Sequence, residues 1–483
     1  MPKIPKRTKI VCTIGPASSS SQVLGDLMDA GMNIARLNFS HGTYAEHKKM
    51  MNRIHAEASV RKLPIGIMQD LQGPKIRVGD ISKNGIELKS GHDIILSTSA
   101  KPAKGKIPVT YANLHKDAKA GQKILLDDGL MDMKVAKVSG RDVHCVVITG
   151  GLLLPHKGIN LPETNVSASS LSDKDKKDAY FGVKNDVDFI ALSFVRSAKD
   201  IIDLRYLIKK YEKQLKKKPS SDIRIIAKIE KREAVECIDD IIEAADGIMV
   251  ARGDLGIETP AEDVPLVQKM LIDKSRAAAK PVIVATQMLD SMIRNPRPTR
   301  AEVSDVANAV IDHTDAIMLS GETASGKYPV ETVATMARIA SRTEASKFDD
   351  VPAPIIRVYE TEEDAMSSVG TILARSTDAK IILVASLSGS AGRIVSRYRP
   401  ELPIFVSTNK ERVYRQLGAS WGVIPFMLPT CASIEELIER ATAYLLQNKL
   451  VKKSDNIIVV AGEPVGVSGH INFVEIRRVG GVA

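Results

Sequence analysis

The chain has 483 residues and carries 68 Lys and Arg against 58 Asp and Glu, which gives a formal net charge of +10. Apolar residues make up 44% and charged residues 26%, a composition that excludes a disordered chain and is typical of a soluble globular protein with several domains. No apolar run reaches the roughly 18 residues of a membrane span, and no apolar segment follows the basic N-terminus. We therefore expect a cytoplasmic protein with no membrane partner.

Cysteine content and charge distribution exclude further classes. The four cysteines are far apart and form no CxxC pair, which argues against a disulfide framework and a cysteine zinc site (Cys12, Cys145, Cys237 and Cys431). Basic residues are spread thinly and aromatic residues reach only 4%, so we expect no nucleic-acid partner. Small anionic substrates explain the basic excess better.

Short apolar runs alternate with segments of helical period over most of the chain. Eight of these runs are predicted strands, at 9–14, 32–39, 65–70, 188–194, 224–229, 247–251, 281–286 and 316–319. Alternation of strand and helix indicates parallel strands, and eight such units predict an α/β protein built on a (β/α)8 TIM barrel. We assign residues 1–73 and 173–343 to this catalytic barrel.

More than about 100 residues separate the third predicted strand from the fourth, whereas a βα loop normally takes about 2–6. This interval contains short alternating segments at 94–96, 124–126, 131–138 and 143–148. Turns rich in Gly and Asp, such as 127–129, separate the segments. We expect residues 74–172 to form an inserted small β-barrel domain that acts as a lid over the barrel mouth.

The pattern changes again near residue 343. Residues 348–359 contain two prolines and little periodicity, as in a linker. Five further strands are predicted, with helical stretches between the first four, at 381–385, 404–407, 423–426, 457–461 and 473–477. Residues 344–483 are therefore expected to form a C-terminal doubly wound α/β domain.

Polar residues lie at or just after the carboxyl ends of seven of the eight predicted barrel strands. A lone polar residue at a strand end is usually a local cap, but so many at one end of a barrel indicate a shared site. In strand order they are Arg36, Asn38, Ser40 and His41; Asp70, Lys75 and Arg77; Ser193; Lys228 and Glu230; Arg252, Gly253 and Asp254; Thr286 and Gln287; Ser320 and Glu322.

Two kinds of chemistry emerge from these residues. Glu230 and Asp254 are hard oxygen ligands without a neighbouring His or Cys, which favours Mg²⁺ or Mn²⁺ over zinc. Lys228 lies two residues before Glu230, so both side chains point to the same face; a simple ion pair is the alternative. A cationic ring suits a phosphoryl group or a carboxylate (Arg36, Lys75, Arg77 and Lys228). Residues 253–256 are interpreted as a tight turn that enters a helix and whose free N–H groups could hold a carboxylate.

Seven ordered motifs spread over the chain resemble those of the pyruvate kinase family. They are KIVCTIGP (9–16), RLNFSHG (36–42), GPKIR (73–77), KIE (228–230), ARGDLG (251–256), ATQML (285–289) and LSGET (319–323). The resemblance implies the family's A, B and C domains and a homotetramer. It also implies a glycolytic kinase that transfers the phosphoryl group of phosphoenolpyruvate to ADP, giving ATP and pyruvate.

The resemblance also implies a role for each matching residue. Glu230 and Asp254 would hold Mg²⁺, and Lys228 would stabilise the charge on the transferring phosphoryl group. Arg36 would bind that group, and the amides of Gly253 and Asp254 would bind the substrate carboxylate. Thr286 would line the face on which the enolate is protonated, with Ser320 and Glu322 in a proton relay. The positions that match nucleotide contacts are Asn38, Ser40, His41, Arg77 and Lys174.

One departure from the family concerns potassium. Many members bind K⁺ through Asn, Ser, Asp and Thr, and their motif reads Gly-Pro-Glu. Here the stretch from Asp70 to Lys75 has Leu71 in place of the Thr ligand, followed by Gln72, and Lys75 in place of the Glu. Because an ammonium group can supply the charge of the ion, we expect activity to need Mg²⁺ but not K⁺, with Lys75 among the catalytic residues.

The C-terminal domain resembles the family's effector-binding domain. A strand-to-helix turn of the kind that binds phosphate contains Ser386, Ser388, Gly389 and Ser390. Its first position departs from the usual Thr, and an ordinary capping turn is the alternative. Residues 462–469 could close over a ligand. Fructose bisphosphate, another sugar phosphate, AMP or no effector all stay open.

Two other functions fit part of the pattern. A Mg²⁺-dependent barrel lyase or aldolase acting on a 2-oxo acid also uses a carboxylate-held metal to stabilise an enolate. It would need neither the inserted domain nor Lys174. A basic scaffold that binds nucleic acid would instead show steep salt dependence and no effect of Glu230→Ala.

Overall fold

Eight parallel strands close into a barrel at the centre of the computed structural model, which describes residues 6–99, 103–164, 166–167, 169–217, 222–351, 361–464 and 471–480. Around the barrel the order is β1-β16-β15-β14-β13-β12-β3-β2. Every predicted strand is present within two residues of its expected ends: β1 Lys9–Thr13, β2 Ile34–Asn38, β3 Gly66–Asp70, β12 Phe189–Leu192, β13 Arg224–Ile229, β14 Gly247–Ala251, β15 Val282–Ala285 and β16 Ala316–Leu319.

Burial on both faces explains why these strands read as continuous apolar runs. Side chains that fill the barrel include Val11, Met68, Phe189, Ile226 and Met249. A larger apolar core joins the strands to the surrounding helices. These helices are α1 Ser21–Ala30, α2 Tyr44–Arg61, α4 Asp173–Lys184, α5 Ala198–Gln214, α6 Arg232–Glu236, α7 Ile238–Ala244, α8 Arg252–Glu258, α9 Val264–Ala277, α10 Arg300–Ile311, α11 Gly321–Ala324 and α12 Pro329–Glu344.

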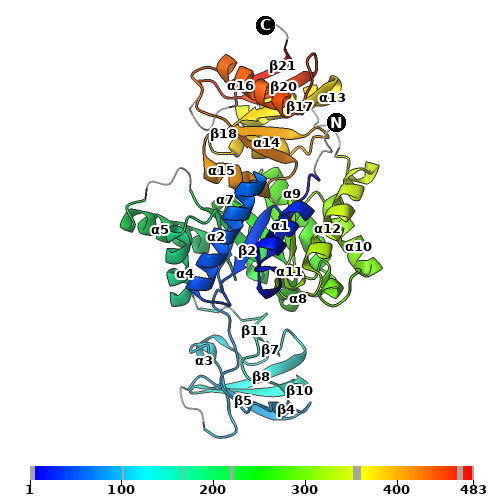
Figure 1. Ribbon diagram of the computed structural model, residues 1–483. Coiled ribbons are helices and arrows are strands. Elements are labelled where there is room, and N and C mark those ends of the chain that lie inside the picture. The colour runs from blue at the N-terminus through cyan, green and yellow to red at the C-terminus, as the bar shows by residue number, and fades with distance from the viewer. Residues whose placement is uncertain are drawn as a thin grey trace.

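The insertion between β3 and α4 forms a separate β structure at one end of the barrel (Figure 1). It has a six-stranded sheet, β11-β7-β8-β9-β5-β6, and a two-stranded sheet, β10-β4. Bridges from Arg77 to Gly158 and from Val78 to Val109 link the two edges of the larger sheet, so it curls back on itself. Its elements are β4 Ile86–Leu88, β5 Asp93–Ser97, β6 Ile107–Pro108, α3 Leu114–Asp117, β7 Lys123–Leu126, β8 Met131–Ser139, β9 Asp142–Thr149, β10 Gly151–Leu153 and β11 Ile159–Asn160.

The C-terminal part lies at the opposite end of the barrel from the insertion (Figure 1). Its five-stranded sheet has the order β19-β18-β17-β20-β21, with only β21 antiparallel, and one apolar core covers each face. This is the expected doubly wound arrangement. Its elements are α13 Glu362–Ser376, β17 Ala379–Ala385, α14 Ser390–Ser396, β18 Ile404–Thr408, α15 Glu411–Gln416, β19 Val423–Met427, α16 Ile434–Gln447, β20 Asn456–Ala461 and β21 Phe473–Arg478.

Four short 3-10 helices complete the described elements: η1 Pro16–Ser18, η2 Asp290–Ile293, η3 Lys347–Asp349 and η4 Leu417–Ala419. The expected linker at 348–359 begins inside η3, and from residue 352 it lies outside the described residues. Most of the segment 462–469 also lies outside them. No helix in the described part of the chain is both long and apolar enough to cross a membrane.

Buried ion pairs join the barrel to the C-terminal part. Asp188, which is fully buried before β12, accepts bonds from Arg415 Nε at 2.9 and 3.1 Å and from the Ile67 amide at 2.8 Å. On the other side of the junction, Arg399 donates to Asp315 at 2.9 Å. These contacts fix the C-terminal part against the amino ends of the barrel strands, away from the polar carboxyl ends.

Asp188→Ala should destabilise this junction by about 3 kcal/mol, because it leaves Arg415 partly buried without its carboxylate. We expect a lower midpoint in chemical denaturation followed by circular dichroism. The matched control is Asp203→Ala, since Asp203 pairs with Lys199 on the surface of α5 and both side chains are exposed. The control should cost less than about 1 kcal/mol. Equal losses for the two variants would contradict the assignment.

Candidate active site

A buried network of charged side chains links the carboxyl ends of β2, β3 and β13. Lys228 Nζ lies 2.8 Å from Glu230 Oε1 and 3.4 Å from Asp70 Oδ1, and it donates to Ser193 Oγ at 2.7 Å. Arg36 Nε donates to Asp70 Oδ2 at 2.6 Å. As expected from alternation along a strand, Lys228 and Glu230 point to the same face.

The charges of this network stabilise one another. Burial by itself raises the pKa of Asp70, but Lys228 and Arg36 outweigh it and hold that pKa below its usual value. Burial likewise lowers the pKa of Lys228, and here Asp70 and Glu230 outweigh it and raise that pKa. Lys228 therefore stays protonated and Asp70 ionised, so both are ready to act electrostatically.

Glu230 and Asp254 are close enough to repel each other. Burial raises the pKa of Glu230, Lys228 opposes this rise, and the charge of Asp254 adds to it. A buried carboxylate beside a second carboxylate suits a divalent cation, which would relieve the repulsion. The described residues contain no group of three or more His, Cys, Asp or Glu side chains that could hold a metal. With Glu230 and Asp254 as its protein ligands, a Mg²⁺ or Mn²⁺ ion would keep positions for other oxygen ligands.

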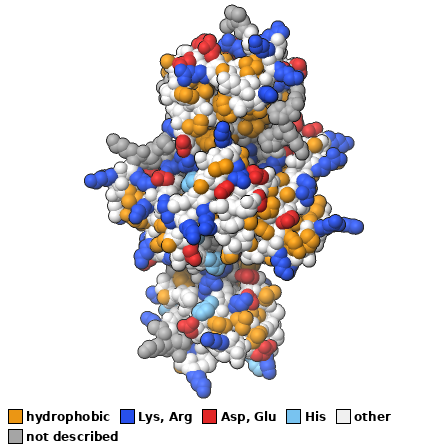
Figure 2. Space-filling model, viewed as in Figure 1, with side chains coloured by type: hydrophobic (Ala, Val, Ile, Leu, Met, Phe, Trp, Pro, Cys, Tyr) orange, Lys and Arg blue, Asp and Glu red, His pale blue; other side chains and the backbone are white. Residues whose placement is uncertain are grey.

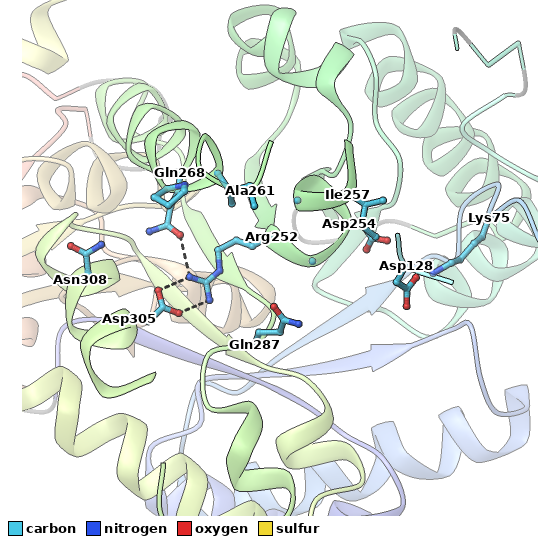
Figure 3. Close-up of a pocket in the computed structure, with 14 residues that line it drawn as sticks. Lys75, Asp128, Arg252, Asp254, Ile257, Ala261, Gln268, Gln287, Asp305 and Asn308 are labelled. Atoms are coloured by element: carbon cyan, nitrogen blue, oxygen red, sulfur yellow. Dashed lines mark hydrogen bonds and ion pairs between the residues drawn. The ribbon is translucent and has the colours of Figure 1, made fainter. Parts of the chain in front are cut away.

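A cavity of about 740 Å³ lies between the barrel mouth and the lid. Lys75, Gly253, Asp254 and Gln287 line it, as does Asp128 from the lid. Figure 3 shows Lys75 beside Asp128, with Asp254 close to both. Lys75 therefore shares a cavity with the metal-binding candidate Asp254.

A second cavity, of about 720 Å³, opens beside the charged network. Arg36, Asn38, His41 and Ser320 are among its lining residues. Asn38 Oδ1 accepts a bond from the Ser40 amide at 3.0 Å. The structure thus brings three of the expected nucleotide contacts (Asn38, Ser40 and His41) next to Arg36.

Ser40 and the other two expected nucleotide contacts, Lys174 and Arg77, are not among the lining residues of the second cavity. Lys174 Nζ bonds to Asp178 Oδ2 at 2.6 Å and to the Phe39 carbonyl at 2.5 Å. The guanidinium of Arg77 donates to the His156 carbonyl at 2.9 Å, at the base of the lid. The expected cationic ring is therefore divided between the network, the first cavity and the lid.

The segment after β14 differs from the sequence prediction. Residues 252–258 already form helix α8, so the interpretation of 253–256 as a tight turn that enters a helix is wrong. The amide of Gly253 donates to Thr286 Oγ1 at 2.8 Å and is not free. The reason is tertiary, because β14 and β15 are adjacent and Thr286 follows β15 directly.

Glu322 is buried behind the barrel mouth. Its carboxylate accepts bonds from the Ser320 amide at 2.7 Å and from the Leu289 amide at 3.2 Å. Burial raises the pKa of Glu322. A buried carboxyl group that binds a proton more readily suits the expected relay.

Comparisons with known proteins show the family of this chain. The family model of the pyruvate kinase barrel domain matches residues 5–333, and that of the pyruvate kinase alpha/beta domain matches residues 364–477. The chain belongs to the pyruvate kinase family. It is accordingly a pyruvate kinase in enzyme class, a phosphotransferase built on a TIM barrel.

Pyruvate kinases from several organisms are similar over nearly the whole chain. That of Geobacillus stearothermophilus is 45% identical over 479 residues, which cover 98% of this chain and 80% of the relative. The pyruvate kinase of Clostridium acetobutylicum is 42% identical, and the alignment covers 98% of this chain and 100% of the relative. The crystal structure of a pyruvate kinase from Cryptosporidium parvum superposes with a TM-score of 0.90 at 36% identity. The superposition covers 98% of this chain and 96% of that one.

The turn with the expected effector residues lies between β17 and α14. Gly389 has φ +78°, and Ser388 Oγ lies 2.8 Å from Ser390 Oγ. The Ser386 amide donates to the Ser407 carbonyl at 3.1 Å. Arg224, at the start of β13, donates to the Ser388 carbonyl at 3.2 Å. These internal bonds fit both a phosphate site and a capping turn.

Several residues around the site were not expected from sequence. Ser193 and Arg252 were noted at strand ends but received no role. Thr13, which accepts a bond from Arg36 at 2.8 Å, and Asp128 on the lid carried no separate signal. Asp305 lies on α10 and carries a bidentate bond to Arg252, and no strand-end rule points to a helix residue.

Proposed function

We propose that the barrel mouth transfers the phosphoryl group of phosphoenolpyruvate to ADP and releases pyruvate, with ATP as the other product. The observation that carries this proposal is the buried network of Arg36, Asp70, Lys228 and Glu230, with Asp254 close by. Phosphoryl transfer needs positioning and electrostatic stabilisation more than covalent chemistry. Arg36 and Lys228, which the buried carboxylates hold in place, supply both the positioning and the electrostatic stabilisation.

Each side chain has one part in this proposal. Arg36 and Lys228 bind the phosphoryl oxygens, and Lys228 stabilises the charge that develops as the group moves. Glu230 and Asp254 hold Mg²⁺ or Mn²⁺, which when bound supplies positive charge to the substrate oxygens. Thr286 lines the face of the enolate that is protonated, and Ser320 and Glu322 form the relay behind it.

Substrate ends are held by neighbouring groups. The amide of Asp254 receives the carboxylate of phosphoenolpyruvate, and the Gly253 amide joins it only if Thr286 moves. The nucleotide occupies the second cavity, near Asn38, Ser40 and His41, with Lys174 and Arg77 reaching its phosphates from α4 and the lid. Closure of the lid would exclude water from the transfer.

We also propose that K⁺ is not required. Both oxygens of Asp70 face protein cations, and Asn38 Oδ1 accepts a backbone amide. Leu71 is buried and offers no ligand oxygen. The ammonium group of Lys75, in the same cavity as Asp254, supplies the charge that the ion supplies elsewhere.

A comparison of the wild type with the Glu230→Gln variant tests the proposed function. With Mg²⁺ present, the wild type should form pyruvate from phosphoenolpyruvate only when ADP is added, as measured in a coupled assay. The variant should need at least about tenfold more Mg²⁺ for half-maximal rate, because an amide is a weaker ligand than a carboxylate. Mn²⁺ binding followed by electron paramagnetic resonance should weaken in parallel.

The matched control is Glu236→Gln, because Glu236 lies on the surface and forms an exposed pair with Arg232. It should behave as the wild type. Pyruvate formation that does not depend on ADP would contradict the kinase and favour the barrel lyase. An unchanged Mg²⁺ requirement in Glu230→Gln would contradict the metal site.

The remaining proposals follow from family membership. We propose that the protein is a homotetramer in the cytoplasm. Each chain would have three domains: the barrel (1–73 together with 173–343), the lid (74–172) and the C-terminal domain (344–483). We further propose that the turn formed by Ser386, Ser388, Gly389 and Ser390 binds a phosphate effector. Initial rates against phosphoenolpyruvate, with and without fructose bisphosphate, another sugar phosphate or AMP, identify the effector or show that there is none.

Nucleic acid and membranes are not among the proposed partners. Figure 2 shows Lys and Arg side chains scattered over all three parts of the visible face and mixed with Asp and Glu. A nucleic-acid site would instead gather them into a patch or stripe.

A further inference from the structure

The backbone just after β15 is strained. Thr286 has φ +76° and Gln287 has φ +54°, so two successive residues with side chains occupy the left-handed region. For a β-branched residue such as Thr this region is a genuine outlier, and it costs on the order of 1–3 kcal/mol. Such strain persists only where the surrounding structure imposes it.

Arg252 imposes this conformation from the neighbouring strand end. One of its guanidinium nitrogens donates to the Thr286 carbonyl at 2.8 Å. The same guanidinium forms a bidentate interaction with Asp305, in which two of its nitrogens donate to Oδ1 and Oδ2 at 2.7 Å each (Figure 3). It also lies 3.5 Å from Gln268 Oε1. A planar fork that reaches a carboxylate and a carbonyl together is a task that Arg can perform and Lys cannot.

The strained conformation sets the direction of the Thr286 hydroxyl group. Thr286 Oγ1 accepts the Gly253 amide at 2.8 Å, so its hydrogen must point elsewhere. Within the described part of the chain, no acceptor receives that hydrogen. Gly253 lines the cavity at the barrel mouth, so the hydroxyl group is held at the edge of that cavity.

We propose that Asp305 and Arg252 form a positioning pair for Thr286. Asp305, on α10, orients the guanidinium; the guanidinium holds the Thr286 carbonyl; and the resulting backbone turn presents the hydroxyl group to the substrate. Neither Asp305 nor Arg252 needs to touch a reacting atom. The inference rests on the proposed function, in which Thr286 lines the face where the enolate is protonated.

A double-mutant cycle between Asp305→Ala and Thr286→Ala tests this pair. Two rates are measured with Mg²⁺ present: ADP-dependent pyruvate formation, and exchange of the pyruvate methyl hydrogens for deuterium, followed by NMR. Asp305→Ala should slow the exchange by about 10-fold to 100-fold, as expected for a displaced group at the substrate. Asp305→Glu should restore part of the rate, because it can still hold the guanidinium.

The decisive result is the double variant. If Asp305 acts through Thr286, adding Asp305→Ala to Thr286→Ala should slow the exchange by less than about twofold more. Losses that multiply would overturn the inference, since they would show that Asp305 acts by another route. Thermal melting should show that every variant is folded at the assay temperature, and Glu236→Gln serves as the control with both rates unchanged.

The test separates the inference from the function on which it rests. A wild type that forms no pyruvate from phosphoenolpyruvate and ADP would overturn the proposed function and this inference with it. If the wild type is active and the Asp305→Ala variant catalyses the exchange at the wild-type rate, the inference alone is overturned.

Discussion

Lys228→Met should lower kcat for pyruvate formation by at least about 1,000-fold. Removing a preorganised cation from a buried phosphoryl-transfer site costs two to five orders of magnitude in related settings. The Lys228 ammonium is held by Glu230 at 2.8 Å and by Ser193 at 2.7 Å, so it has little freedom and its side chain is only 12% exposed. Steady-state rates at saturating phosphoenolpyruvate, ADP and Mg²⁺ measure the effect.

The matched control is Lys176→Met. Lys176 pairs with Asp173 on the exposed surface of α4, so this variant removes the same charge without changing the network. It should retain the wild-type kcat. Circular dichroism should show that Lys228→Met keeps its fold. A variant that keeps kcat and only raises KM would contradict the role, because Lys228 would then bind substrate and transition state equally.

Lys75→Glu should convert the enzyme from K⁺-independent to K⁺-dependent. The wild type should have the same kcat/KM in KCl and in a tetraalkylammonium salt at constant ionic strength. The variant replaces a positive charge in the cavity of Asp254 with a negative one, so it should lose at least about 100-fold without K⁺. Added K⁺ should restore at least about tenfold, and Leu71→Thr in the same chain should increase that recovery by supplying a ligand oxygen.

The control is Lys83→Glu, because it changes the net charge of the protein by the same two units as Lys75→Glu. Lys83 lies on the exposed surface of the lid and should show no dependence on K⁺. A wild type whose kcat/KM rises tenfold or more with K⁺ would contradict the proposal directly. Loss of activity in Lys75→Glu that K⁺ cannot restore would show that Lys75 has a role other than replacing the ion.

The barrel strands could be predicted closely because burial constrains both of their faces. Strand β13 reads Arg-Ile-Ile-Ala-Lys-Ile, and the structure places it at the expected residues. The short helix α3 in the lid, by contrast, was not predicted. Its four residues, Leu114–Asp117, are too few for a periodic pattern to emerge.

The geometry of the candidate site could be predicted where one strand delivers its own residues. Lys228 and Glu230 share a face because they are two positions apart, and this local rule needs no knowledge of the rest of the fold. The expectation that the Gly253 amide is free was wrong, because Thr286, which directly follows the neighbouring strand β15, accepts its hydrogen bond. Asp305 could not be foreseen, since its link to Arg252 joins positions 53 apart in sequence.

By itself, the sequence determined which segments become strands and which polar residues lie at the end of each barrel strand. Those properties follow from hydrophobic period and from backbone alternation, which act over a few residues. Only the tertiary structure decided which charges meet. The pairing of Arg36 with Asp70, the strained turn at Thr286 and its support by Asp305 all depend on distances between elements remote in sequence. The excess of ten positive charges likewise acquires local meaning only where the fold places Arg36 and Lys228 in one buried network and Lys75 in the cavity of Asp254.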